Sequence, residues 1–194
     1  SNIKIQGPAD GESAFKECKN LLVKNSSFKL RYPFWHDSSC EYRNCKLAVT
    51  ARAPLWYDKD INIFKMKCKG VKALRECKNV VVEDSDFDSI EFGWQCNNIL
   101  IKNTNIVSSY AFLHSNNVSL ENIQFKGKYS FQYINGLKIK NSVLDTKDAF
   151  WHTKNAVIEN CTVKGEYLAW YSENITFINC HIISNFSRPF HSCA

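Results

Sequence analysis

The residues that first look able to do chemistry lie in a short phrase, PFWHD at 33–37, which brings a tryptophan, a histidine and an aspartate together. Such a set could serve acid–base catalysis if it occurred once. Related phrases recur as PLWYD at 54–58, FGWQC at 92–96, AFWHT at 149–153 and LAWYS at 168–172. Because an enzyme needs its catalytic group only once, five near copies in one small chain indicate a structural repeat.

Charged neighbours offer the remaining candidates for catalysis. Acid–base chemistry would need a carboxylate pair or an acid with a shifted pKa, and the best local candidates are Glu76 beside Arg75, and Glu17 beside Lys16. A solvated charge pair explains both neighbours more simply. We therefore assign no catalytic residue and no cofactor, and we lean towards a protein that is not an enzyme.

Composition limits the class of protein. A chain of 194 residues with 44% hydrophobic residues is long enough for one domain with a substantial core, so we predict a single domain over residues 1–194. No apolar run approaches the roughly 20 residues of a membrane helix, and the first residues lack a signal peptide. We expect no membrane partner and a cytoplasmic location. A net charge of +6, with basic and acidic residues alternating, does not predict nucleic-acid binding.

The spacing of asparagines reveals the repeat. One series steps by 19 residues throughout and consists of Asp84, Asn103, Asn122, Asn141, Asn160 and Asn179. Asn25 and Asn44 are also 19 residues apart. The 40 residues from Asn44 to Asp84 fit two repeats with a two-residue insertion, which puts Lys65 at the missing place. Asn2 lies 23 residues before Asn25, which places a four-residue insertion within GPADGES.

Each repeat contains a short strand just before its asparagine, as in NVVVED, NILIKN, NVSLEN and NAVIEN. Apolar residues alternate within these strands, which is typical of a strand with one buried face. The last outward position reads Glu83, Lys102, Glu121, Lys140 and Glu159 in successive repeats. Opposite charges alternate favourably on neighbouring parallel strands, about 4.8 Å apart, only if the repeats stack in register.

A second polar column lies five residues before the first. Its members are Asn20, Ser39, Asp60, Asn79, Asn98, Asn117, Gly136, Asn155 and Asn174. Asparagine tolerates the left-handed conformation of a tight corner, and its amide can bond the same amide one repeat away. We therefore expect two corners and a continuous ladder from Asn103 to Asn179. The sequence predicts a single-stranded right-handed parallel β-helix of about nine 19-residue coils, roughly 45 Å long.

The recurring phrases, such as PFWHD and AFWHT, then occupy equivalent positions in successive coils of this solenoid. One column is large and apolar, which predicts core: Phe15, Phe34, Leu55, Leu74, Gly93, Phe112, Phe131, Phe150 and Ala169. The next is predicted to face outward: Lys16, Trp35, Trp56, Arg75, Trp94, Leu113, Gln132, Trp151 and Trp170. In the third, every side chain can form hydrogen bonds: Glu17, His36, Tyr57, Glu76, Gln95, His114, Tyr133, His152 and Tyr171.

Nine cysteines also follow the repeat. Stacking brings Cys77 near Cys96, and Cys161 near Cys180, at separations that a disulfide could span. Proximity here follows from the repeat alone. Without a visible leader peptide we expect reduced cytosolic thiols. No close Cys and His pairs recur at metal-ligand spacing, so we predict no metal site.

Longer phrases resemble a known family. GPADGESAFKE, LRYPFWHD, FGWQCNN, GKYSFQY, DTKDAFWH and GEYLAWYSEN, in this order, are similar to the uncharacterised, mainly bacterial family called domain of unknown function 3737. The resemblance covers nearly the whole chain and implies a pectin-lyase-like right-handed β-helix, with no implied activity. Members tend to be longer, so it also implies either further chain beyond NFSRPFHSCA or a shorter variant.

Two functions remain open. A non-catalytic binding or scaffold module explains the repetition with the fewest assumptions. The alternative is a carbohydrate-binding or carbohydrate-active protein, since outward aromatic rings can stack on sugars. In either case we expect a carbohydrate or another protein as partner. The candidate ligand-binding residues are Trp35, Trp56, Arg75, Glu76, Trp94, Tyr133, Trp151, His152 and Trp170.

Overall fold

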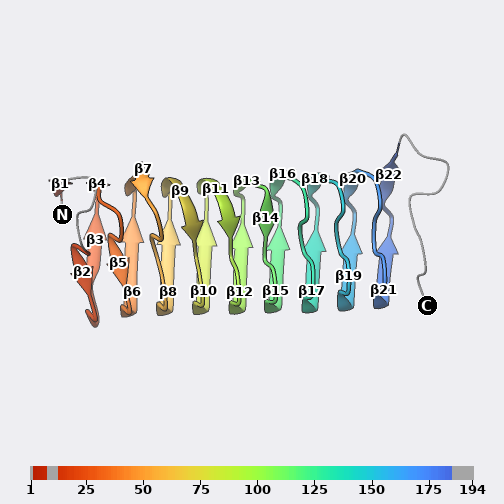
Figure 1. Ribbon diagram of the computed structural model, residues 1–194, viewed down its shortest axis with the longest axis horizontal. Helices are drawn as coiled ribbons and strands as arrows, with labels where there is room; N and C mark the ends of the chain where they lie inside the picture. The colour runs from red at the N-terminus through yellow and green to blue at the C-terminus, as the bar shows by residue number, and fades with distance from the viewer. Residues whose placement is uncertain (1, 8–12, 185–194) are drawn as a thin grey trace.

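The computed structural model describes residues 2–7 and 13–184. These residues form 22 β-strands and no α-helix, and successive coils stack along one axis into a rod (Figure 1). Within the described ranges no helix could cross a membrane. The four-residue insertion within GPADGES and the tail NFSRPFHSCA fall almost entirely outside the described residues. The parallel β-solenoid predicted from the sequence is confirmed.

One long side of the rod is an 11-stranded parallel sheet that follows the first asparagine corner. Strand β14 (Tyr110–Ala111) pairs with β11 off the main path. The main path runs through β1 (Lys4–Gln6), β4 (Ser27–Lys29), β7 (Lys46–Ala51), β9 (Lys67–Ala73), β11 (Asp86–Phe92), β13 (Asn105–Ser108), β16 (Gln124–Gly127), β18 (Val143–Asp145), β20 (Thr162–Lys164) and β22 (His181–Ile183).

The second side is a 9-stranded parallel sheet that precedes the same corner. It consists of β3 (Leu22–Lys24), β6 (Ser38–Arg43), β8 (Lys59–Phe64), β10 (Lys78–Glu83), β12 (Asn97–Lys102), β15 (Asn116–Glu121), β17 (Asn135–Lys140), β19 (Lys154–Glu159) and β21 (Glu173–Ile178). The third side is less regular. It holds the pair β2 (Phe15–Lys16) and β5 (Phe34–Trp35), and then isolated bridges from Trp35 to Trp56 and from Trp56 to Arg75.

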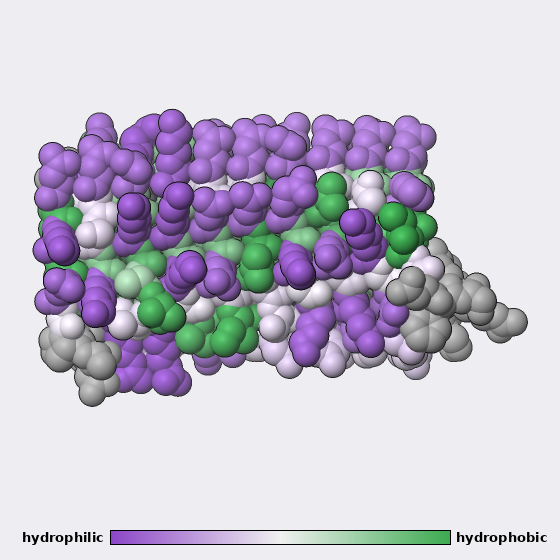
Figure 2. Space-filling view, turned by 90° about the horizontal axis from the view of Figure 1, so that it is seen from above, coloured by the Kyte–Doolittle hydropathy of each residue, from purple (hydrophilic) through white to green (hydrophobic). Residues whose placement is uncertain are grey.

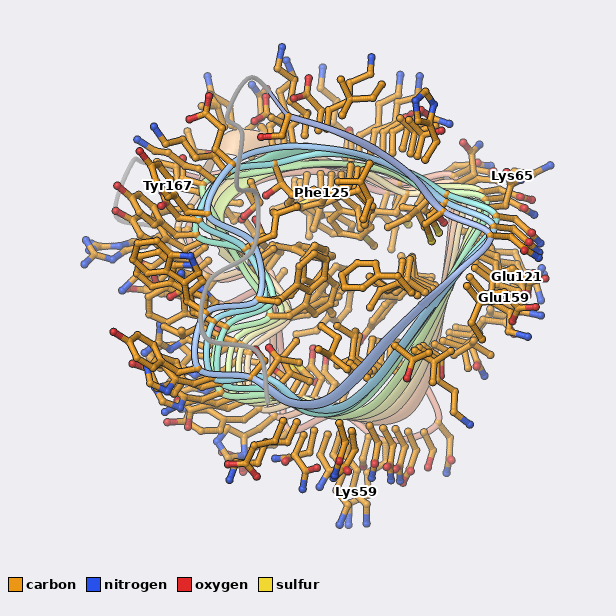
Figure 3. All side chains as sticks on the ribbon, turned by 90° about the vertical axis from the view of Figure 1, so that its right-hand side faces the viewer. Lys59, Lys65, Glu121, Phe125, Glu159 and Tyr167 are labelled. Atoms are coloured by element: carbon orange, nitrogen blue, oxygen red, sulfur yellow. The ribbon has the colours of Figure 1, made fainter. Side chains whose placement is uncertain are left out.

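The register matches the repeat read from the sequence. Val80 pairs with Ile99, and Glu83 with Lys102, one repeat away. In the predicted charge column, Lys102 forms an ion pair with Glu121 at 3.2 Å and Lys140 one with Glu159 at 2.7 Å. Seen along the axis, Glu121 and Glu159 point outward from this sheet, whereas Phe125 points into the interior (Figure 3).

Both asparagine columns form corners with left-handed backbone. Asn122 and Asn98 have φ values of 52° and 58°. Lys65 has a φ of 52° in the first column, and Ser39 and Gly136 have φ values of 54° and 79° in the second, so the substitutes adopt the same geometry. Such angles are rare outside glycine, asparagine and aspartate. The corner prediction is therefore confirmed even where asparagine is absent.

The amide ladder at the first corner is exposed, and its stretch from Asn103 to Asn179 has one gap. Among the described residues no side-chain bond joins Asn122 to Asn141, so the prediction of a continuous ladder from Asn103 to Asn179 is wrong at this step. The backbone bond from Asn122 N to Lys140 O, 3.0 Å, holds these two coils instead. Amide bonds elsewhere join Asn44 to Asn25 (2.8 Å), Asn103 to Asp84 (3.1 Å), Asn122 to Asn103 (2.8 Å), Asn160 to Asn141 (3.4 Å) and Asn179 to Asn160 (3.3 Å).

The two-residue insertion lies inside strand β7. Leu47 pairs with Cys68, 21 residues later, but Ala51 pairs with Gly70, only 19 residues later. The extra residues therefore lie between Leu47 and Ala51, where Val49 is 75% exposed. A bulge of this kind lets the strand take up an insertion while the core columns on either side stay in register.

Candidate functional site: the ladder face

The third side of the rod, which we call the ladder face, carries the recurring phrases. From Leu55 onward, each coil begins this face with a buried residue in the left-handed conformation, such as Phe131 at a φ of 61° or Phe150 at 63°. The next side chain, such as Trp151, is half-buried and points outward. The third, such as His152 with a φ of 53°, also points outward. The left-handed residues turn the chain, so strict alternation does not hold here.

Left-handed backbone at a phenylalanine is a feature that the sequence did not predict. A bulky residue pays a steric cost of roughly 1–2 kcal/mol in this region. Burial of its ring offsets that cost, because Phe131 is fully buried and stacks between Phe112 and Phe150 at 5.7 and 5.2 Å. The prediction that this column is core is confirmed.

A column of small polar side chains lies on the inner side of the ladder face. This column was also not predicted from the sequence. It occupies the position after the His and Tyr column and points inward. Cys96 N donates to Ser115 Oγ at 3.0 Å, and Thr153 N donates to Ser172 Oγ at 3.3 Å. These hydroxyls accept the backbone N–H groups that the tight turn leaves unpaired. The aspartate of PFWHD belongs to this structural column, so it does not form a triad with the exposed histidine.

The buried aspartates of this column lie in adjacent coils. Asp37 and Asp58 are each 1% exposed, and Asp37 N donates to Asp58 Oδ1 at 2.9 Å. Tyr42 donates its hydroxyl to Asp37 Oδ2 at 3.0 Å, while Asp58 Oδ2 has no partner within the described residues. Burial raises the pKa of Asp37, and it raises the pKa of Asp58 well above its usual value, with the nearby Asp37 adding to the effect. Both carboxyls therefore lie inside the core.

The tryptophans form two stacks on the ladder face. Trp35 and Trp56 stack with ring centroids 6.1 Å apart, and Trp151 and Trp170 stack at 4.9 Å with an interplanar angle of 3°. Each tryptophan is half-buried. The indole N–H of Trp151 donates to Tyr167 O at 2.6 Å, which fixes the ring at its outer edge. The predicted outward orientation is confirmed, and the rings also pack on neighbours within the chain.

The His and Tyr column forms a longer stack beside the tryptophans. His114, Tyr133, His152 and Tyr171 follow one another with centroid distances of 4.7, 4.7 and 5.1 Å and interplanar angles of 24° or less. Tyr133 and Tyr171 are 45% and 57% exposed. In an earlier pair of coils, His36 lies 4.8 Å from Tyr57. Within these two runs the column therefore presents one imidazole or phenol group per coil towards solvent.

This geometry decides which part of each ring a ligand can reach. Rings that stack on one another along the rod cover much of their own flat faces. Their edges, with phenol hydroxyls and imidazole nitrogens, remain in solvent. The ladder face consequently offers a row of hydrogen-bonding groups about every 4.8 Å rather than a row of open aromatic platforms.

A charged cluster separates the first tryptophan stack from Trp94. Arg75 donates to Glu91 at 3.0 Å and to Glu76 at 3.3 Å, and its guanidinium lies 5.3 Å from the centre of the Trp94 ring. Trp56 Nε1 also donates to Glu76 at 3.4 Å. The solvated pair expected of Arg75 and Glu76 is thus a half-buried network that ties adjacent coils together, and Glu91 is a member that the sequence did not suggest.

The structure divides the predicted site residues into two groups. Trp35, Trp56, Arg75, Glu76 and Trp94 lie in consecutive coils, and Tyr133, Trp151, His152 and Trp170 lie in a second run. Leu113 and Gln132 occupy the tryptophan column between the groups, and Gln132 donates to Asp148 O at 2.7 Å. These two coils without a tryptophan separate Trp94 from Trp151 in the predicted aromatic column. Tyr32, Tyr110 and Tyr167 flank the column and were missed, because their positions repeat only in some coils.

The eight described cysteines are free thiols. Cys77 and Cys96 are buried in adjacent coils, and Cys77 N donates to Cys96 Sγ at 3.4 Å. Burial raises the pKa of the Cys77 thiol well above its usual value, and that of the Cys68 thiol to about 12. Most of these cysteines behave as small apolar core residues. In the described part of the chain, no three His, Cys, Asp or Glu side chains gather as metal ligands would.

Fold and side-chain columns together define a β-solenoid whose long faces carry ladders of like residues in register. The chain belongs to the family described as protein of unknown function DUF3737, whose model matches residues 1–190. No curated protein matches it.

Comparison with solved structures finds matches at low sequence identity. A surface adhesin of Streptococcus pneumoniae, PfbA, is 7% identical, with a TM-score of 0.47 over 89% of this chain and 72% of that one. QnrB1, a plasmid-mediated fluoroquinolone resistance protein, is 8% identical, with a TM-score of 0.24 over 87% of this chain and 91% of that one. At such scores neither protein carries a functional argument for this chain, and the pectin-lyase-like assignment stays a prediction.

Proposed function

We propose that this protein is a non-catalytic binding or scaffold module, and that the ladder face is its docking surface. The observation that supports this most is the run of His114, Tyr133, half-buried His152 and Tyr171, which repeats a hydrogen-bonding edge in four consecutive coils. A repeated surface of this kind fits an extended partner that lies along the rod. The flanking tryptophans would supply apolar contact beside the polar edges.

An extended polypeptide suits this surface better than a stacked sugar. Peptide groups repeat donors and acceptors along a chain and can meet a row of hydroxyl and imidazole edges. Sugar rings that stack on tryptophan need an open face, and Trp151 and Trp170 cover part of each other's faces at 4.9 Å. Carbohydrate binding remains the alternative, through hydroxyl contacts to the edges or through the end of a stack.

Selection from a phage-displayed library of random peptides tests the proposal. The key variant carries Tyr57→Phe, Tyr133→Phe and Tyr171→Phe, which keeps the rings and removes three hydroxyls. Peptides selected on the wild-type protein should bind this variant at least about tenfold more weakly, as expected for three lost hydrogen bonds worth about 0.5–1.5 kcal/mol each. A control with Asn62→Ala and Ser119→Ala on the 9-stranded sheet should bind like the wild type.

Two outcomes count against the peptide-binding proposal. Selected peptides that bind the triple variant as tightly as the wild type would place docking elsewhere. A glycan array in parallel covers the alternative: clear binding that is lost in Trp170→Ala supports a carbohydrate ligand, and a blank array favours a protein partner.

For the compartment, we propose the cytoplasm. The support is chemical: Cys77 and Cys96 lie in adjacent coils, and their thiols donate to Leu55 O at 3.2 Å and to Leu74 O at 3.0 Å, an arrangement that suits reduced thiols. Mass spectrometry of protein isolated from its native cells, with free thiols blocked at lysis, tests this. A Cys77–Cys96 disulfide in that material would contradict it.

A further inference from the structure

A second surface, on the 11-stranded sheet, carries a run of lysines in its first four coils. The outward residues of this sheet form two lengthwise columns. In the first four coils they include Lys4, Lys29, Lys46, Lys67 and Lys69, all exposed. None of the five forms an ion pair within the described part of the chain. Residues 1–80 contain 16 of the 25 basic residues but only 8 of the 19 acidic ones, and two of those eight, Asp37 and Asp58, are buried.

Other lysines of this protein form ion pairs that stabilise the stacking of coils. On the 9-stranded sheet, Lys102 and Lys140 each lie opposite a glutamate and pair with it at 3.2 and 2.7 Å. On the 11-stranded sheet, Lys46 pairs in register with Lys67, as Lys59 does with Lys78 on the other sheet, so two ammonium groups face each other across adjacent strands. Lys67 in turn has Asp86 opposite it in the next coil. Like charges in that position destabilise a sheet. An anionic partner would remove this repulsion.

The shape of the surface indicates a linear partner. The two outward columns form the walls of a shallow trough whose floor is the sheet backbone. One hollow of about 330 Å³ lies between Lys4, Lys29 and Lys46, and another of about 320 Å³ follows beside Lys67 and Asp88. Seen from above, rows of hydrophilic side chains run along the rod with hydrophobic residues between them (Figure 2).

We propose that this lysine trough binds an acidic, extended segment of another polypeptide. From Lys4 to Lys67 the trough rises through three coil steps, about 14 Å, which four or five residues of an extended chain span. The basic stretch ends at Asp86 and Asp88, which would repel a polymer that is anionic throughout. A polypeptide can place acidic residues against the lysines and other residues beyond them.

The walls of the trough also favour a polypeptide over a nucleic acid. Gln6, Ser27 and Asn105 can bond peptide groups, and Ala48 and Val107 offer apolar contact. Neither column carries an aromatic residue in the first six coils, whereas single-stranded nucleic acids bind where bases can stack.

Fluorescence anisotropy with a labelled hexaglutamate peptide tests this second docking surface. We expect binding at about 50 mM salt that weakens strongly at about 300 mM. Lys46→Glu with Lys67→Glu should weaken it at least tenfold. The matched control, Lys78→Glu with Lys138→Glu, changes the net charge equally on the 9-stranded sheet and should weaken it less than threefold. The triple tyrosine variant of the ladder face should bind hexaglutamate like the wild type, so the two proposals fail independently.

Three results would overturn the proposal. Absence of hexaglutamate binding at low salt would do so, since the trough would then have no affinity for acidic peptide. An equal loss in both charge variants would show that net charge alone attracts the peptide. Tighter binding of a six-nucleotide oligo-dT than of hexaglutamate would assign the surface to nucleic acid. Circular dichroism establishes that each variant retains the β-sheet spectrum of the wild type.

Discussion

The rings of Tyr133 and His152 stack with centroids 4.7 Å apart and an angle of 11° between their planes, although the two residues are 19 positions apart in the chain. Tyr133 stacks equally closely on His114 in the preceding coil. One tyrosine therefore joins three coils on the outside of the rod. Its hydroxyl remains free for a ligand because the stack uses the ring faces.

Replacing Tyr133 separates the structural part of this role from the binding part. Tyr133→Ala removes both ring contacts and should lower the free energy of unfolding by about 1–2 kcal/mol. Tyr133→Phe keeps both contacts and should change it by less than about 0.5 kcal/mol. Urea denaturation followed by circular dichroism measures both values. Equal stability of the alanine and phenylalanine variants would show that the stack contributes nothing.

The gap in the asparagine ladder predicts unequal effects of one substitution at two corners. Asn103 has amide bonds to both Asp84 and Asn122, at 3.1 and 2.8 Å, whereas Asn122 has only the bond to Asn103. Both residues have left-handed backbone, so leucine brings the same strain at either site. Asn103→Leu should therefore destabilise the protein by about 1 kcal/mol more than Asn122→Leu. A larger loss at Asn122 would contradict the observed gap.

Much of the fold was predictable because the solenoid converts a 19-residue period into physical stacking. The columns that contain Asn122 and Phe131 each repeat one environment, so periodicity alone separated corner from core. The bulge in β7 could be counted but not located, because Ala48, Val49 and Thr50 look like any other strand residues. The left-handed Phe131 was missed since its residue type argues against that conformation.

The candidate site was predictable only in part. Column membership placed Trp151 and Trp170 side by side and outward, but it could not show that their flat faces cover each other. Ring orientation depends on packing against flanking residues such as Tyr167, whose position does not recur in every coil. The lysine trough was missed for a related reason: the charge pattern was read along the 9-stranded sheet, where Lys and Glu alternate, and the other sheet does not follow it.

The buried carboxyls predict an unusual pH dependence of stability. Burial raises the pKa of Asp58 in the folded state above its value near 4 in the unfolded chain. At a pH between these two pKa values, the unfolded chain releases a proton that the folded chain keeps. This group's contribution to stability is therefore greatest below pH 4 and falls as the pH rises through the folded pKa. Asp58→Asn keeps the acceptor for Asp37 N and removes the ionisation.

Thermal melts of Asp58→Asn measure this effect directly. We expect a Tm above that of the wild type by at least about 3 °C at pH 7, and a much smaller difference at pH 4. The contrary result would be a Tm of the variant that falls below the wild-type Tm at pH 7 but not at pH 4. That result would mean that the Asp58 carboxylate is stabilising in the folded protein.

The reactivity of the cysteine thiols should differ between buried and exposed positions. Cys40, Cys45, Cys68, Cys77, Cys96 and Cys161 are buried, and burial raises the pKa of the Cys68 thiol to about 12, so little reactive thiolate is present at pH 8. Reaction with Ellman's reagent should modify no more than three of the nine cysteines rapidly in the native protein, and all nine in denaturant. Rapid modification of six or more would contradict the packed core.

Hydroxyl-radical footprinting read by mass spectrometry tests the exposed ladder face most directly. We predict fast oxidation of Tyr133 and Tyr171, which are 45% and 57% exposed, intermediate oxidation of Trp151 and Trp170, and protection of the fully buried Tyr42. Monomeric protein, isolated by size exclusion, serves as the sample so that no partner chain covers the surface. Protection of Tyr133 and Tyr171 to the level of Tyr42 in that monomer would contradict an accessible ladder face.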